Sequence, residues 1–147
     1  MVLKTPDTSL SSNMITAKQD ITNQEDVKRL LDAFYAKVLK DDVIGYIFTD
    51  IANIDLPEHM PVLYSFWETI LFGVANYRGN PILKHIELHK KEPLTDAHFD
   101  RWISLFFETI DELFEGKTAD LAKEKAKAMR FLMQHKIKAS EGAGFIQ

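Results

Sequence analysis

The stretch TDAHFDRWISLFFETIDELFEG, residues 95–116, predicts one long amphipathic helix and decides the fold class of this chain. Thr95 is a suitable amino-terminal cap, and Gly116 is placed like the glycine that often follows a helix. Large apolar residues recur between them at the spacing of one helix face. They are Phe99, Trp102, Ile103, Phe106, Phe107, Ile110, Leu113 and Phe114. A stripe this long has to be buried against other elements, so the stretch predicts a helix of the core.

Two earlier segments show the same periodicity. Thr22 and Glu25 have the spacing of a capping box, which predicts a helix that begins there and ends near residues 41–42. Pro57 suits a first helical residue, because its missing N–H leaves no helical bond unmade. The helix predicted from Pro57 ends before the breaker sequence at residues 77–81.

A fourth long helix is predicted after residue 117, with Thr118 as its cap. Pro81 can begin a brief helix that continues over residues 82–88, and residues 43–48 can form one helical turn. No segment alternates with the period of a strand. The sequence therefore predicts an all-α fold with four main helices.

The ends of the chain differ from this periodic part. Residues 1–20 are polar, rich in Ser and Thr and without helical period, so we interpret them as a flexible extension. Residues 21–139 form one predicted domain, since the 147 residues suffice for one sizeable core. Residues 140–147 contain two glycines and are interpreted as a flexible tail.

Composition narrows the classes of function. The formal net charge is −4, which does not favour a nucleic-acid or acidic-membrane partner. Cysteine is absent, which excludes disulfides, thiolate metal sites and cysteine nucleophiles. No run has the length of a signal peptide core or a membrane span, so the expected location is the cytoplasm, without a membrane partner.

Histidine is the residue type most often found as a metal or haem ligand. His85 follows a Gly-Asn-Pro turn in the apolar segment PILKHIEL, where an anchored short helix could aim its imidazole as an axial ligand. The structural alternative is that His85 only covers an edge of the core. His85 and His89 also have the spacing of a two-histidine zinc pair, with Glu87 or Glu92 as further ligands, but the pattern of the helical zinc hydrolases is absent.

Three other polar residues have positions from which they could reach an apolar pocket. His59 lies in the first turn of its predicted helix, four residues before Leu63 on the apolar stripe. Tyr35 and Trp102 lie at core positions, and buried hydroxyl and indole N–H groups usually need a partner. Near one cavity they would suit a bound polar diatomic molecule; alternatively, both residues only pack the core.

The order and spacing of six short motifs resembles the truncated haemoglobins over residues 21–135, most closely their third group. The motifs are Phe34-Tyr35, Gly45-Tyr-Ile-Phe48, His59, Phe66-Trp67, Leu83-Lys-His85-Ile-Glu-Leu88 and Phe99-Asp-Arg-Trp102. The Gly-Gly loop motifs of the other groups are missing, in agreement with the third group.

This resemblance implies a globin-like two-over-two helical sandwich around haem b. It makes His85 the proximal ligand of the iron and places Phe48 against the haem face. The remaining pocket residues that it implies are Tyr35, His59, Leu63 and Trp102 on the distal side, with Phe66 and Trp67 lining the pocket. Arg78 and Lys84 lie in the segment where cations would meet the haem propionates.

The function implied is reversible binding of O2 or another diatomic ligand, NO or CO, at a His-ligated iron. NO dioxygenase or peroxidase-like chemistry would fit the same site, and the dioxygenase reaction would need an electron-donating reductase as partner. The alternative is a cofactor-free helical interaction module. A Soret band in the absorption spectrum separates the two.

Overall fold

The computed structural model describes residues 17–53, 55–74 and 81–142, and all of the described elements are helical. They are α2 (Gln24–Lys40), the π-helical turn η1 (Ile47–Ile51), α3 (Leu56–Phe72), α4 (Pro81–Lys91), α5 (Asp96–Leu113) and α6 (Lys117–Gly142). The described residues contain no strand, only an isolated bridge between Gln19 and Phe114. The predicted all-α class is confirmed, and none of the described helices is both long and apolar enough to cross a membrane.

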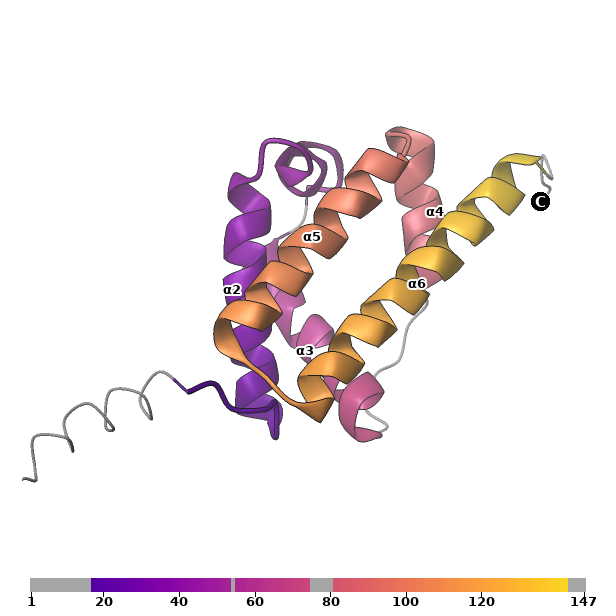
Figure 1. Ribbon diagram of the computed structural model, residues 1–147. Helices are drawn as coiled ribbons and strands as arrows, with labels where there is room; N and C mark the ends of the chain where they lie inside the picture. The colour runs from indigo at the N-terminus through magenta and orange to yellow at the C-terminus, as the bar shows by residue number, and fades with distance from the viewer. Residues whose placement is uncertain (1–16, 54, 75–80, 143–147) are drawn as a thin grey trace, which may run out of the picture.

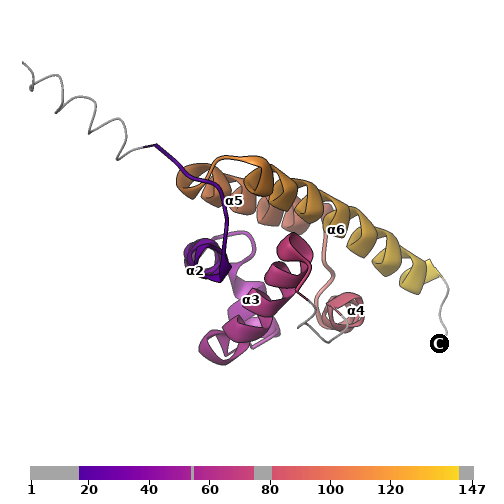
Figure 2. The same ribbon diagram turned by 90° about the horizontal axis from the view of Figure 1, so that it is seen from below.

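The helices form two crossed layers. α5 and α6 lie side by side in one layer, and α2 and α3 lie in the other (Figures 1 and 2). α2 packs on α3 and α5, whereas α6 packs on α5, α3 and α4. The short helix α4 packs against α6 and is seen beneath it in Figure 2. This arrangement is the two-over-two helical sandwich that the resemblance implies.

The core is centred on the contact between α2 and α5. Phe34 of α2 and Phe106 of α5 are fully buried and meet edge to face, with ring centroids 5.0 Å apart. Burying a side chain of this size stabilises the fold by roughly 1.5–3 kcal/mol. Ala122 and Ala126 of α6 are also completely buried, and their small side chains allow α6 to lie close against the core.

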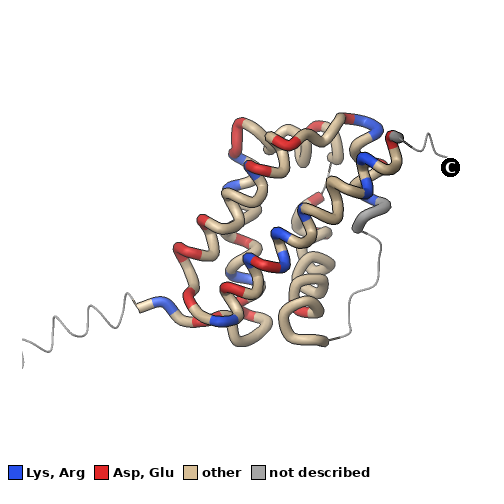
Figure 3. Tube along the Cα trace, turned by 45° about the vertical axis from the view of Figure 1, so that its right-hand side comes forward, with Lys and Arg blue, Asp and Glu red and all other residues tan. Residues whose placement is uncertain are grey.

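Ion pairs connect α5 to its neighbours on both sides. Lys37 of α2 binds Glu108 and Glu112 of α5, at 2.8 and 2.7 Å. From the other side, Lys123 and Arg130 of α6 bind carboxylates of α5. Figure 3 shows both signs of charge on the described helices, with Lys and Arg frequent along α6. Exposed pairs of this kind stabilise the fold by at most about 1 kcal/mol each. Their main effect is to fix how α5 is aligned with α2 and α6.

The predicted start of α2 was wrong by one position. Asn23, not Thr22, is the cap, and its side-chain oxygen accepts a bond from the backbone N–H of Asp26 at 2.9 Å. Thr22 instead donates its backbone N–H and its hydroxyl to the Asp26 carboxylate, at 2.8 and 3.1 Å. The predicted capping box between Thr22 and Glu25 therefore does not form. Its place is taken by Asn23, which accepts from the Asp26 N–H, and by Asp26, which accepts from Thr22.

The predicted cap of α6 was also wrong. The helix begins at Lys117, and the carboxylate that satisfies its first turn comes from Asp20. Asp20 accepts bonds from the backbone N–H groups of Thr118 and Ala119, at 2.9 and 2.8 Å, and from that of Ile21 at 2.8 Å. Because Asp20 and the start of α6 are far apart in the sequence, no local sequence pattern indicates that Asp20 caps this helix.

Gly116 does not end α5 in the predicted way. The helix ends at Leu113, and its carboxy-terminal cap is Phe114 in an extended conformation. Gly116 has φ +148°, and a Cβ at this position would lie 2.6 Å from Oδ2 of Asp20. Glycine is therefore required because the Asp20 carboxylate occupies the space of a side chain.

Two other predicted boundaries are confirmed, and two differ from the prediction. Thr95 caps α5, and Pro81 is the first residue of α4. Pro57, predicted as the first residue of its helix, is instead the second residue of α3, because Leu56 directly follows the Asp55 cap. α6 continues to Gly142, beyond the position at which we expected a flexible tail, and residues 143–147 and 1–16 lie outside the described residues.

Candidate functional site

Aromatic side chains from α2, η1 and α5 meet around Phe34. The ring of Tyr35 lies 4.8 Å from that of Phe34 and 5.8 Å from that of Phe48, both edge to face. Trp102 lies 6.1 Å from Phe34 and stacks on Phe106 at 5.6 Å, with an angle of 2° between the planes. The structure therefore brings Tyr35, Phe48 and Trp102 into one aromatic cluster.

α3 adds two further predicted residues to the same cluster. Trp67 is buried and stacks on Phe106 with ring centroids 4.9 Å apart. Phe66 contacts Trp67 edge to face at 5.8 Å, and Leu63 packs against the core while remaining partly exposed. Trp67 thus lies at the base of the cluster, and Leu63 and Phe66 lie nearer its surface.

The Tyr35 hydroxyl is the clearest polar feature of this cluster. Tyr35 is only 9% exposed, yet its hydroxyl forms no hydrogen bond within the described part of the chain. Every fully enclosed side-chain nitrogen or oxygen among the described residues has a partner, so this hydroxyl must reach open space. Burial raises the pKa of Tyr35 well above its usual value, which keeps the group protonated as a donor.

The indole N–H of Trp102 is in a similar position. It makes no hydrogen bond with any described residue, although the ring packs closely on Phe106. Tyr35 and Trp102 both contact Phe34, so these two donors belong to one neighbourhood. Because buried hydroxyl and indole groups usually find partners, the pair is suited to a ligand that accepts hydrogen bonds.

His59 lies in the first turn of α3 and is partly buried. Burial lowers its pKa, and the positive charge of Lys84 on α4 lowers it further. The imidazole is therefore neutral at neutral pH. Because the charge of Lys84 acts on His59, the start of α3 lies near the part of α4 that carries His85. His85 is itself partly buried.

α3 and α4 leave much of their apolar surface incompletely covered. Only Met60 and Trp67 are buried among the 17 residues of α3, and none of the described side chains of α4 is. Among the described residues, α3 and α4 pack mainly on other helices rather than on each other. Since a helix has to bury its apolar face, these two helices suit a flat apolar group between them, with histidines on both sides. The residues present therefore fit a haem.

The remaining histidines have other roles. His89 accepts a bond at Nδ1 from the backbone N–H of Leu94, at 2.9 Å, and its Nε2 contacts Glu141. His98 likewise uses both ring nitrogens. His135 is exposed and stacks on Phe131. Among the described residues, no group of three or more His, Cys, Asp or Glu side chains could hold a metal ion.

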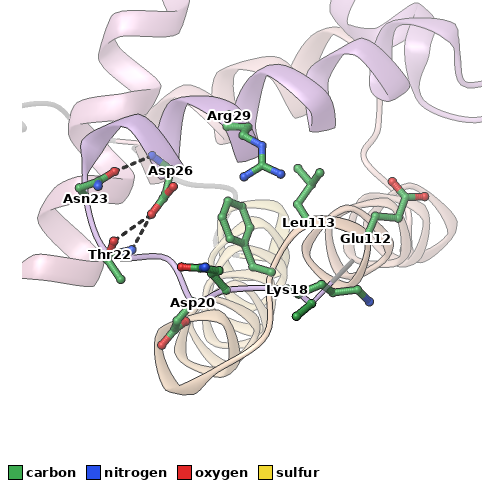
Figure 4. A pocket seen from close by; sticks show the side chains of 11 residues that line it. Lys18, Asp20, Thr22, Asn23, Asp26, Arg29, Glu112 and Leu113 are labelled. Atoms are coloured by element: carbon green, nitrogen blue, oxygen red, sulfur yellow. Dashed lines mark hydrogen bonds between the residues drawn. The ribbon is translucent and has the colours of Figure 1, made fainter. Parts of the chain in front are cut away.

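A separate pocket of about 420 Å³ lies at the other end of α2 and α5 (Figure 4). Charged and polar residues, among them Lys18, Asp20 and Glu112, form much of its wall. Arg29 extends over the ring of Phe114, 5.1 Å from its centroid. This polar lining does not suit an apolar cofactor, and Tyr35 and Trp102 lie towards the opposite ends of the same helices.

Several residues that shape the site were not singled out from the sequence. Phe34 was part of the Phe34-Tyr35 motif but was not predicted as a pocket residue, and Phe106 carried only the signal of the helical stripe. The rings of Phe34 and Phe106 contact Tyr35, Trp102 and Trp67. The role of His98 had a local signal, since it follows Thr95 at the spacing of a capping box. Arg78 lies outside the described residues, and Lys84 is exposed on α4.

Comparisons with known proteins agree with this geometry. The chain is 28% identical to the group 3 truncated hemoglobin ctb of Campylobacter jejuni over 123 residues, which cover 82% of this chain and 94% of that protein. The crystal structure of group III truncated hemoglobin from Campylobacter jejuni matches with a TM-score of 0.72 and covers 82% of this chain and 95% of the other. The family model of the bacterial-like globins matches residues 16–138. The predicted resemblance is confirmed, and the chain belongs to the bacterial-like globin family.

Proposed function

We propose that this globin binds haem b between α3 and α4, with His85 as the axial ligand, and that it holds O2 or another diatomic gas on the side of Tyr35 and Trp102. The observation that carries the proposal is the Tyr35 hydroxyl, which is nearly buried and has no hydrogen-bond partner in the described residues. Membership of the globin family implies a haem cofactor, and bound haem iron supplies the reversible binding of the gas.

On the proximal side, α4 carries both residues that the proposal needs. His85 would offer an imidazole nitrogen to the iron, which is the usual role of a proximal histidine in globins. Lys84 is exposed next to it and would attract a propionate. Phe48, at the edge of the aromatic cluster, would cover part of one face of the cofactor.

On the distal side, the chain offers two donors and a neutral imidazole. Tyr35 and Trp102 would donate hydrogen bonds to a ligand that carries partial negative charge. His59 lies in the first turn of α3, where its partly buried ring would control entry. Leu63, Phe66 and Trp67 would exclude water around the ligand, which strengthens such bonds.

Absorption spectra of wild type and His85→Ala test the proposal. The wild type should show a Soret band and respond to CO in the ferrous state. His85→Ala should lose most of its haem, or retain it with the spectrum of a site that lacks the protein ligand. His135→Ala is the matched control, since His135 is exposed on α6 and should leave the spectrum unchanged. A wild-type spectrum and full haem content in His85→Ala would show that the assignment is wrong.

The same donors suit a second activity. Tyr35 and Trp102 would also stabilise negative charge that develops during NO dioxygenase or peroxidase-like turnover. NO dioxygenase turnover requires an electron-donating partner. Consumption of NO by the O2-bound protein, followed over repeated cycles with a chemical reductant, tests this activity, and a single stoichiometric cycle would argue against it.

A further inference from the structure

The corner between α4 and α5 is closed by two histidines in the same way. Leu94 and Thr95 are consecutive, and each donates its backbone N–H to Nδ1 of a neighbouring imidazole. Leu94 donates to His89 at 2.9 Å, and Thr95 donates to His98 at 3.0 Å. Two adjacent backbone donors that would otherwise lack helical partners are thus satisfied by side chains, one from the end of α4 and one from the start of α5.

These bonds fix the tautomer of both rings. A neutral imidazole accepts at one nitrogen and donates at the other. Since both Nδ1 atoms accept, both Nε2 atoms carry the proton. His89 therefore donates to the Glu141 carboxylate on α6. His98 donates to the Tyr46 hydroxyl at 3.2 Å, and Tyr46 in turn donates to Glu92 at 2.8 Å.

Each histidine thus connects the corner to another part of the molecule. The bond from His89 joins α4 to the last turns of α6. The bonds through Tyr46 join the start of α5 and the residue after α4 to the segment that leads into η1, two residues before Phe48. The elements that carry His85 and Phe48 are therefore held at this corner.

α4 is a short helix that packs mainly on α6, so its direction also depends on bonds at its end. The helix has 11 residues, and none of its described side chains is fully buried. Its last backbone bond runs from Glu92 to Leu88 at 3.0 Å, and the next N–H in the corner, that of Leu94, is the one taken by His89. A short helix with little buried area can tilt easily unless its end is fixed.

We propose that His89 and His98 are positioning residues that hold the α4–α5 corner and thereby set the direction of the His85 imidazole. The inference rests on the proposed function, because it concerns the residue proposed as the iron ligand. Neither histidine would touch the cofactor; both would act through the placement of α4.

The test uses the haem-bound, full-length protein in the ferrous state with four variants. His89→Ala and His98→Ala remove the acceptors. His98→Gln keeps a side-chain acceptor, since Gln is a residue type that serves at this capping-box position. His135→Ala removes an exposed histidine as control. The measurements are amide exchange at Leu94 and Thr95, the iron–histidine stretching band in resonance Raman spectra, and the rate of haem transfer to an excess of apomyoglobin.

We expect both alanine variants to speed amide exchange at the corresponding residue by up to about tenfold, the value of one lost hydrogen bond. Both should also shift or broaden the iron–histidine band and speed haem loss. His98→Gln should restore all three, and His135→Ala should match wild type. The broadened band is the decisive readout, since a loss of global stability alone would not change the geometry at the iron.

Two other results are distinguishable. Faster exchange at Leu94 and Thr95 with an unchanged iron–histidine band and unchanged haem loss would overturn this inference while leaving the proposed function intact. A wild-type protein without a Soret band would overturn the proposed function and this inference with it.

Discussion

Tyr35 is the residue at which a single atom can be removed with least disturbance to the fold. Its ring contacts Phe34 and Phe48, and these contacts do not involve the hydroxyl, which forms no hydrogen bond in the described part of the chain. Tyr35→Phe therefore keeps the packing and removes only the donor.

We expect Tyr35→Phe to speed O2 dissociation by about ten- to a hundredfold. A hydrogen bond to a charged group contributes roughly 1.5–3 kcal/mol, and about 1.4 kcal/mol corresponds to a factor of ten. Bound CO is less polar, so its dissociation should change much less. Stopped-flow measurement of both rates checks this prediction.

The matched control is Tyr64→Phe, because the Tyr64 hydroxyl binds Asp32 on α2 instead of facing the cluster. It should leave both rates unchanged. Trp102→Phe should also speed O2 dissociation, and the double variant should show less than the product of the two effects, because the donors would share one ligand. Equal acceleration of O2 and CO in Tyr35→Phe would indicate a packing role instead.

A second prediction concerns the charge on His59. Burial and the neighbouring Lys84 both lower its pKa, so Lys84→Gln should move its titration midpoint upward, towards the ordinary value of about 6.5. NMR titration of the imidazole in the diamagnetic CO-bound protein measures the midpoint. Lys136→Gln, at an exposed lysine near the end of α6, is the control. An unchanged midpoint in Lys84→Gln would mean that the two side chains are farther apart in solution.

The sign of the stability effect follows from the direction of this shift. The unfolded chain binds a proton at His59 more readily than the folded chain, so stability is complete above the ordinary histidine pKa and decreases as the pH falls below it. Lys84→Gln should reduce this loss in mildly acidic solution.

At the scale of elements, the start of α6 depends on a residue almost a hundred positions earlier. The Asp20 carboxylate takes the place of the local cap, and the Gly116 backbone leaves room for it. Burial alone would raise the pKa of Asp20, but bonds from Thr118, Ala119 and Ile21 outweigh it and leave the pKa lowered. The ionised form is thus the one that holds the helix.

Asp20→Ala should lower the free energy of unfolding by about 0.5–2 kcal/mol, the usual value of a lost helix cap. Urea denaturation of the wild type and the variant measures the difference. Because the folded pKa is lowered, the difference should be complete above the ordinary aspartate pKa of about 3.9 and shrink as the pH falls below it. Asp42→Ala, at an exposed position in the turn after α2, should have little effect. Equal losses for both variants would contradict the capping role.

At the scale of the whole molecule, α3 and α4 have too few neighbours for their apolar surface. α3 is rich in large apolar residues, yet Leu63, Phe66 and Ile70 are only partly buried. The contacts among α2, α5 and α6 are well packed by comparison, with Phe34, Phe106 and Ile110 fully buried. We therefore expect a bound cofactor to bury additional apolar surface mainly on α3 and α4.

Haem should raise the thermal stability of this globin. A ligand present at a hundred times its dissociation constant stabilises the folded state by about 2.7 kcal/mol, which corresponds to a rise in Tm of roughly 5–10 °C for a chain of this size. Thermal unfolding of haem-free and haem-bound protein, followed by circular dichroism, gives the difference. Equal Tm values would show that α3 and α4 pack fully without the cofactor.

The sequence by itself determined the helices and suggested part of the aromatic cluster, but not the central roles of Phe34 and Phe106. The helical period of the apolar residues predicted α2, α3, α5 and α6, and Pro81 and Thr95 predicted the starts of α4 and α5. These features depend on the chain within one or two turns, so a local pattern contains them. The resemblance through short motifs added the two-over-two arrangement, which periodicity alone does not specify.

Only the tertiary structure decided which groups satisfy one another. Asp20 at the start of α6, and His89 and His98 at the α4–α5 corner, meet backbone donors because the fold brings them near. Any acceptor within reach can satisfy such a donor, so the sequence leaves many candidates and the packing selects one. The unpartnered Tyr35 hydroxyl follows the same rule: its position was predictable, but its lack of a partner was visible only once its neighbours were in place.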